Sequence, residues 1–146
     1  MDPTEVANRI RALTSRTERH DDDPTVIAER LGIEVLAVDR MWLAGDRGEY
    51  SRVDDVGRIY VDERLRGATF AAVVAHELGH ALCDSLAIAT SDEEKWCDAF
   101  GRILVWRARR LFAVPVRHNA EIVHSSAQCE DLGPLELAAI SVDAPT

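Results

Sequence analysis

The hydrophobic pattern at the start of the chain has helical spacing. Asp2 and Pro3 are typical of a helix start, with Asp as the cap and Pro in the first turn. The pattern predicts a first helix that ends near Arg19. The residues expected on its apolar face are Val6, Ile10, Leu13 and Thr17.

The next segment changes from a helical pattern to the pattern of strands. Asp23-Pro24 repeats the helix-start signal and predicts a short helix through Leu31, which Gly32 ends. Short runs of apolar and β-branched residues then predict strands over residues 33–38, 49–53 and 58–61. Asp54-Asp55-Val56-Gly57 is a turn signal that joins the last two strands as a hairpin. We therefore expect a small antiparallel sheet.

Two long helices are predicted after the sheet. Residues 68–84 are helix-compatible almost throughout and are apolar on several sides, as in a helix buried in a core. A second long helix is expected over residues 92–112, before Pro115, and short helices over 120–128 and 134–140. This order predicts an α+β fold in which the antiparallel sheet packs on the two long helices.

Length and composition fit one globular domain. The chain has 146 residues, of which 47% are hydrophobic and 29% are charged, and these values are ordinary for a globular protein. We expect a single domain over residues 1–146, with its core at about 24–112. An N-terminal helix in residues 1–20 and a C-terminal extension over 115–146 flank that core.

Charge and the lack of long apolar runs narrow the classes of partner. The formal net charge of −9 disfavours direct binding to nucleic acid or to an anionic membrane. Nothing resembles a signal peptide, and no run of 18 apolar residues occurs. A cytoplasmic protein with a protein or peptide partner is expected. Cys83, Cys97 and Cys129 match no zinc pattern or disulfide framework, so free, buried thiols are expected.

The candidate chemistry lies inside the predicted helix 68–84, at His76-Glu77-Leu78-Gly79-His80. Two histidines four residues apart project from one face of a helix, so their imidazoles can share one metal ion. Glu77 directly follows the first histidine, where its carboxylate reaches a water on the metal and can act as the general base. Zinc lowers the pKa of bound water from about 15.7 to about 7, which suits this role at neutral pH. The motif predicts one Zn²⁺ per chain, held in part by His76 and His80.

The third metal ligand has to come from another element. A longer three-histidine motif would continue at positions that here hold Cys83 and Leu86. In the next helix, Glu94 and Asp98 lie four residues apart on one face and resemble the Glu-x-x-x-Asp element of thermolysin-like gluzincins. Glu94 would complete a His₂Glu site, and Asp98 would accept the outer N–H of a ligand histidine.

Other roles for this acidic segment stay open. Ser91 to Glu94 has the pattern of a capping box, and Thr90 with Glu93 could serve the same purpose. Glu93 and Asp92 are therefore alternative third ligands, and Cys83 could also approach the metal. The candidates for an oxyanion donor, which the sequence does not rank, are Tyr50, Tyr60, His118 and His124.

With these motifs in place, the chain resembles the ImmA/IrrE family of metallopeptidases, small zincin-like proteins of bacteria, phages and mobile elements. The similarity covers about residues 24–105. The matching segments are Leu31-Gly32-Ile33-Glu34-Val35, Arg58-Ile59-Tyr60-Val61-Asp62, Ala75-His76-Glu77-Leu78-Gly79-His80-Ala81-Leu82, and the run from Glu94 to Gly101. In that run Cys97, Asp98 and Gly101 replace the Ala, Asn and Ala usual in the family, and no proline follows Val105, which predicts a longer helix.

The resemblance implies a zincin-like fold and a zinc-dependent endopeptidase in which His76, His80 and Glu94 hold the metal, Glu77 activates water and Asp98 orients a ligand. It also implies a protein substrate or regulator, such as a helix-turn-helix repressor of a phage or mobile element. Two alternatives stay open. The chain could be a metal-stabilised regulatory module, an anti-repressor or toxin–antitoxin component, that binds its partner without cleavage, or it could be a general neutral peptidase.

Overall fold

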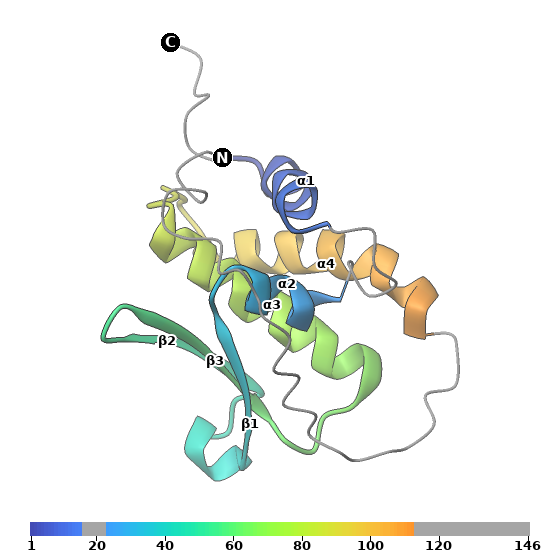
Figure 1. Cartoon of the computed structure of the whole chain (residues 1–146). Helices are drawn as coiled ribbons and strands as arrows, with labels where there is room; N and C mark the ends of the chain where they lie inside the picture. Colours follow the sequence, from blue (N-terminus) through green and yellow to red (C-terminus); the bar gives the residue numbers. More distant parts are fainter. Residues whose placement is uncertain (16–22, 113–146) are drawn as a thin grey trace.

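A computed structural model of the chain describes residues 1–15 and 23–112 (Figure 1). The short helices predicted over 120–128 and 134–140, and the residues His118, His124 and Cys129, lie outside the described residues. Within the described part the elements alternate between helices and a small sheet, so the predicted α+β class is confirmed.

Helix α1 (Pro3–Thr14) begins as its sequence predicts, because the Asp2 side chain accepts a hydrogen bond from the Glu5 backbone N–H at 3.2 Å. Its predicted end near Arg19 is wrong, since Ser15 already has an extended backbone. A tertiary contact accounts for this early end: Arg30, in helix α2 (Pro24–Arg30), donates to the Thr14 carbonyl.

The buried face of α1 also differs from the predicted one. Ala7 and Thr14 join Val6 and Ile10 in the core, whereas Leu13 is 36% exposed. The Thr14 hydroxyl can be buried because it donates to the Ile10 carbonyl at 2.9 Å. Thr17 lies outside the described residues.

The sheet has three strands, β1 (Glu34–Val38), β2 (Gly48–Val53) and β3 (Val56–Asp62), in the order β1-β3-β2. The predicted hairpin is present, with a two-residue turn at Asp54 and Asp55. Both residues have positive φ (52° and 63°), as this kind of hairpin turn requires and Asp tolerates.

The prediction of an antiparallel sheet is wrong for one of its two strand pairs. β2 and β3 are antiparallel, but β1 pairs parallel to the central strand β3, with Val35 opposite Ile59. The chain between β1 and β3 includes the short 3₁₀ helix η1 (Arg40–Leu43) and β2, which together return it to the end of the sheet where β1 began. This crossover permits the parallel pair and leaves β2 at the edge.

Helices α3 (Gly67–Ser85) and α4 (Glu93–Phe112) are close to their predicted ranges. Figure 1 shows the helices gathered on one side of the sheet, and α3 contacts β2 and β3 directly while α4 packs on α3 and against α1. The core at these contacts includes Ile10, Ile27, Ile59, Val61, Val74, Leu78, Leu82, Phe100 and Leu104.

Two glycines allow α3 and α4 to lie unusually close together. A Cβ on Gly79 of α3 would lie 3.0 Å from the Cys97 sulfur, and a Cβ on Gly101 of α4 would lie 3.2 Å from the His76 backbone nitrogen. Real Cβ atoms are rarely that close to a neighbour, so larger residues would push the helices apart. The helices therefore meet at the position of the candidate site.

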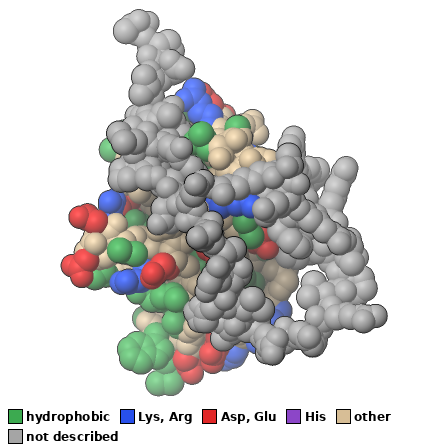
Figure 2. Space-filling view, in the orientation of Figure 1, with side chains coloured by type: hydrophobic (Ala, Val, Ile, Leu, Met, Phe, Trp, Pro, Cys, Tyr) green, Lys and Arg blue, Asp and Glu red, His purple; other side chains and the backbone are tan. Residues whose placement is uncertain are grey.

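Figure 2 shows apolar side chains gathered at the end of the molecule where η1 lies, among acidic and basic side chains. Met41 and Trp42 of η1 are 88% and 82% exposed. No helix among the described residues is long and apolar enough to cross a membrane.

Candidate metal centre and active site

The candidate site lies in a cavity of about 1030 Å³ bounded by β2, α3 and the first turn of α4. Strand β2 lines one side from Gly48 to Arg52, and α3 contributes His76, Glu77 and His80. Because α3 is otherwise a core helix, its polar residues on this face have the cavity as their outlet.

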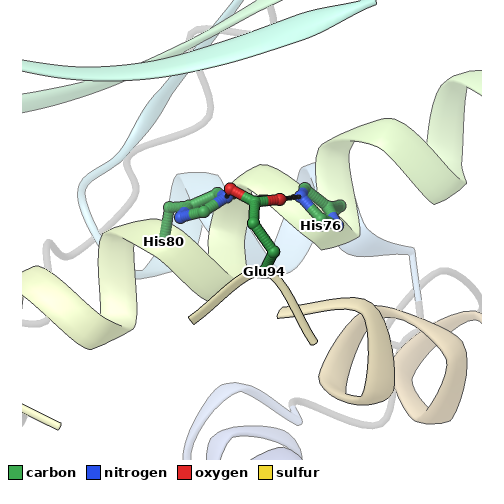
Figure 3. A group of neighbouring side chains, drawn as sticks. All are labelled: His76, His80 and Glu94. Atoms are coloured by element: carbon green, nitrogen blue, oxygen red, sulfur yellow. Dashed lines mark hydrogen bonds and ion pairs between the residues drawn. The ribbon is translucent and has the colours of Figure 1, made fainter. Parts of the chain in front are cut away.

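His76, His80 and Glu94 come together at this cavity, as Figure 3 shows. The Nε2 atoms of the two histidines lie 3.2 Å apart. The Glu94 carboxylate lies against both rings, with one oxygen 3.3 Å from His76 Nε2 and the other 3.4 Å from His80 Nε2. The Glu94 side chain is 75% exposed, so this group stands at the open mouth of the cavity.

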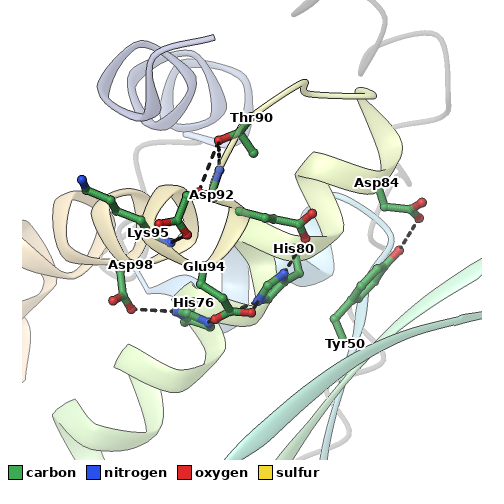
Figure 4. Close-up of polar contacts among 10 residues, drawn as sticks. Tyr50, His76, His80, Asp84, Thr90, Asp92, Glu94, Lys95 and Asp98 are labelled. Atoms are coloured by element: carbon green, nitrogen blue, oxygen red, sulfur yellow. Dashed lines mark hydrogen bonds and ion pairs between the residues drawn. The ribbon is translucent and has the colours of Figure 1, made fainter.

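The other ring nitrogen of each histidine contacts a carboxylate of α4 (Figure 4). His76 Nδ1 lies 3.0 Å from Asp98 Oδ1, and His80 Nδ1 lies 2.7 Å from Glu93 Oε1. An ionised carboxylate only accepts hydrogen bonds, so in both contacts Nδ1 carries the proton and donates it. The sequence analysis anticipated the position of Asp98, but it weighed Glu93 only as a cap or an alternative ligand.

These contacts determine what the inner nitrogens can offer. With both Nδ1–H groups donated outward, each neutral imidazole presents its Nε2 lone pair to the same small region. Two carboxylate oxygens of Glu94 face that region as well. Lone pairs gathered at such distances repel one another, and a shared cation relieves the repulsion. The three residues can hold a metal ion, since their ligand atoms all lie within 4.8 Å of one another.

The first turn of α4 is capped by Asp92, whose side chain accepts from the Lys95 backbone N–H at 3.1 Å. Thr90 in turn contacts Asp92, accepting from its N–H at 3.3 Å and donating to its carbonyl at 3.2 Å. The side chains of Glu93 and Glu94 are thus directed at the histidines, and neither residue forms the capping box that the sequence left open.

Glu77 is the polar residue of α3 that is most deeply buried at this site, with 9% of its surface exposed. Burial raises the pKa of its carboxyl, and the neighbouring His76 and His80 act against this rise by favouring the charged form. The Tyr50 backbone N–H also hydrogen-bonds Glu77 and lowers its pKa. The edge strand β2 therefore holds the Glu77 carboxylate beside the histidines.

Of the four candidate oxyanion donors, only the two tyrosines are described. Tyr50 lines the cavity, but its hydroxyl donates to Asp84 Oδ2 at 3.0 Å, and burial is the main cause that raises its pKa to about 12. Arg52 also donates to Asp84, at 3.3 Å. Tyr60 pairs with Leu36 and Glu49 on the side of the sheet that faces away from α3. The structure thus brings Tyr50, but not Tyr60, to the cavity.

The comparisons with known proteins agree with this site. A model of the IrrE N-terminal-like domain matches residues 13–122. The chain belongs to this family. No curated protein and no solved structure matches it. The family is one of IrrE/ImmA-type metallopeptidases, and the His76, His80 and Glu94 group of this IrrE-like chain is a metal site consistent with a zincin-like centre. A protease family implies a protein substrate.

Proposed function

We propose that this IrrE-like chain is a zinc-dependent endopeptidase that hydrolyses a peptide bond in a specific protein partner. The observation that carries the proposal is the convergence of His76, His80 and Glu94 on one point, with the carboxylate of Glu77 buried beside it. The donor set of two imidazoles and one carboxylate is the one found in catalytic zinc sites that keep a fourth position open. Family membership supports the same class of reaction.

Each residue has a distinct task in this proposal. Zn²⁺, when bound, would supply a Lewis acid and an acidified water for attack on the carbonyl. Glu77 accepts the proton of that water and later passes it to the leaving amine. Asp98 and Glu93 hold the Nδ1–H groups of His76 and His80, so that both Nε2 lone pairs stay directed inward.

The substrate would bind as an extended segment along β2. This strand forms one edge of the three-stranded sheet and lines the cavity, and no described strand pairs with its outer side. A free strand edge binds extended peptides through backbone hydrogen bonds. A helix-turn-helix repressor of a phage or mobile element is the partner we propose, on the resemblance described above.

The test is cleavage of a purified candidate repressor by the zinc-loaded chain, with the new terminus located by mass spectrometry. Glu77→Gln keeps the size of the side chain and the three metal ligands but removes the base, so we expect cleavage to fall by about 10²-fold or more. Glu34→Gln is a matched control, since Glu34 is paired with Arg58 at 2.8 Å in the sheet, away from the cavity.

The same experiment separates the proposal from a regulatory module that binds without cleaving. Such a module would leave the repressor intact, and Glu77→Gln would bind it as well as wild type does. Full cleavage by Glu77→Gln would refute the assigned mechanism. A panel of unstructured peptides, cut as readily as the repressor, would indicate a general peptidase.

A further inference from the structure

A second set of metal-binding side chains lies on the outer side of His80, away from Glu94. His80 and Cys83 are three residues apart on α3, and Glu93 and Cys97 are four residues apart on α4, so each pair shares a helix face. The two faces meet: His80 Nδ1 lies 2.7 Å from Glu93 Oε1, and the Cys83 and Cys97 thiols are hydrogen-bonded to each other. Ligand atoms of His80, Glu93 and Cys97 all lie within 4.8 Å of one another.

The close approach of α3 and α4 brings these groups together. Gly79 has no Cβ, so Cys97 can lie in the space beside it and reach the level of His80. Cys97 is fully buried and Cys83 is 6% exposed, while the Glu93 side chain is 52% exposed. Cys83, His80 and Glu93 all line the cavity, so an ion has a path from solvent to this group.

We propose that Cys83, Cys97, Glu93 and His80 form a second metal site, for a soft divalent ion such as Cd²⁺ or excess Zn²⁺. Two thiolates, one imidazole and one carboxylate make a four-donor set, and thiolates favour soft ions over magnesium or calcium. Binding forms two metal–sulfur bonds and releases both thiol protons to solvent. The carboxylate of Glu93 turns from His80 Nδ1 to the ion.

Occupation of this site affects His80 directly, a consequence that rests on the proposed function of the His76, His80 and Glu94 group. A neutral imidazole offers one lone pair and carries one N–H. An ion on Nδ1 therefore places the proton on Nε2, and His80 is no longer a ligand beside His76. The two sites compete for one histidine, which would make a soft metal ion an inhibitor of the peptidase.

The experiment is titration of the metal-free full chain with Cd²⁺, followed by the near-ultraviolet absorption of the sulfur-to-metal charge transfer. Wild type and Cys129→Ala should show the absorption and saturate at one ion per chain. Cys97→Ala should lose most of it, and Cys83→Ala should retain no more than the share of one thiolate. Glu93→Gln, at a largely exposed side chain, should weaken Cd²⁺ binding without disturbing the core, which covers the case that the cysteine variants unfold.

Two outcomes would overturn the proposal: no thiolate absorption in wild type, or the same absorption in wild type and Cys97→Ala. A total of two ions per chain with Zn²⁺ and Cd²⁺ together would overturn the competition for His80. His76→Ala lacks a ligand of the first site only, so it should lose cleavage and keep the absorption. Failure of the peptidase assay would therefore leave this test intact.

Discussion

The contact between Gly48 and α3 gives the sharpest quantitative test of how the active site is built. Gly48 begins β2, and a Cβ placed there would lie 2.4 Å from Val73 Cγ1 and 3.1 Å from both Cγ and Oε1 of Glu77. Carbon atoms in contact prefer separations of about 3.5–4.0 Å. Gly48→Ala therefore has to displace the edge strand, Val73 or Glu77 by about 1 Å.

The expected cost follows from overpacking. Extra atoms forced into a packed region typically destabilise by about 1–3 kcal/mol. Val73 has little freedom to turn away, because a β-branched side chain in a helix has one strongly preferred rotamer. At about 2–4 °C per kcal/mol for a chain near this size, Gly48→Ala should lower Tm by roughly 2–12 °C. Cleavage should fall further than metal content, since the contact is with Glu77 and not with a metal ligand.

Gly57→Ala is the matched control in the neighbouring strand. A Cβ on Gly57 would lie 3.4 Å from Ile33 Cγ1 and Tyr50 Cε2, which is ordinary contact, and neither glycine has a left-handed backbone. Removing chain entropy from the unfolded state then favours a neutral or slightly stabilising effect for Gly57→Ala. The measurement for both variants is thermal and urea unfolding followed by circular dichroism.

A double mutant isolates the clash itself. Val73→Ala removes the atom at 2.4 Å, so the combined Gly48→Ala and Val73→Ala variant should be more stable than the sum of the single changes predicts. Equal stability of Gly48→Ala and Gly57→Ala, or strict additivity with Val73→Ala, would refute the reasoning that β2 is held at van der Waals contact over Glu77.

Two further predictions concern charges that act through other groups. Glu93→Gln and Asp98→Asn should each weaken zinc binding by about 10–100-fold, because each removes the carboxylate that orients a ligand histidine; chelator competition measures this, and wild-type affinity in both would contradict it. The Arg64 side chain and backbone hydrogen-bond Asp62 and hold the pKa of its carboxyl below the usual range. That stabilisation is present above the unfolded-state pKa of about 3.9 and is lost as pH falls through the lower folded-state pKa. Asp62→Asn should therefore be less stable than wild type at neutral pH, with a difference that shrinks in acid; urea unfolding across pH would contradict this if the difference were constant.

The elements that the sequence predicts well are those determined by local chemistry. The turn at Asp54 and Asp55 and the long apolar helix α3 depend on residues close together in the chain, and both are present near their predicted bounds. The end of α1 and the partner of β1 depend on distant residues. Arg30 meets the Thr14 carbonyl, and β1 pairs with β3 across an intervening strand, so neither contact has a local signal.

The candidate site follows the same division. The spacing of His76 and His80 on one helix, and the placement of Glu94 one helix later, were sufficient to predict the group that comes together. The partner of His80 Nδ1 was not predicted, because the sequence offers three capping residues before Glu93 and does not show which one is used. Once Asp92 caps α4, its rotation is fixed, and Glu93 and Glu94 point toward different histidines.

The separation of α3 and α4 connects the two metal sites. Helix axes usually lie 8–10 Å apart, at distances set by the side chains between them. With Gly79 and Gly101 at the contact, the first turn of α4 comes near enough for its carboxylates to reach both histidines. The same closeness leaves a small space beside Gly79 that Cys97 fills, where the family usually has alanine. A thiol in that space is buried among apolar atoms but also adjacent to His80, so one packing decision supplies both the geometry of the peptidase centre and the sulfur ligand beside it.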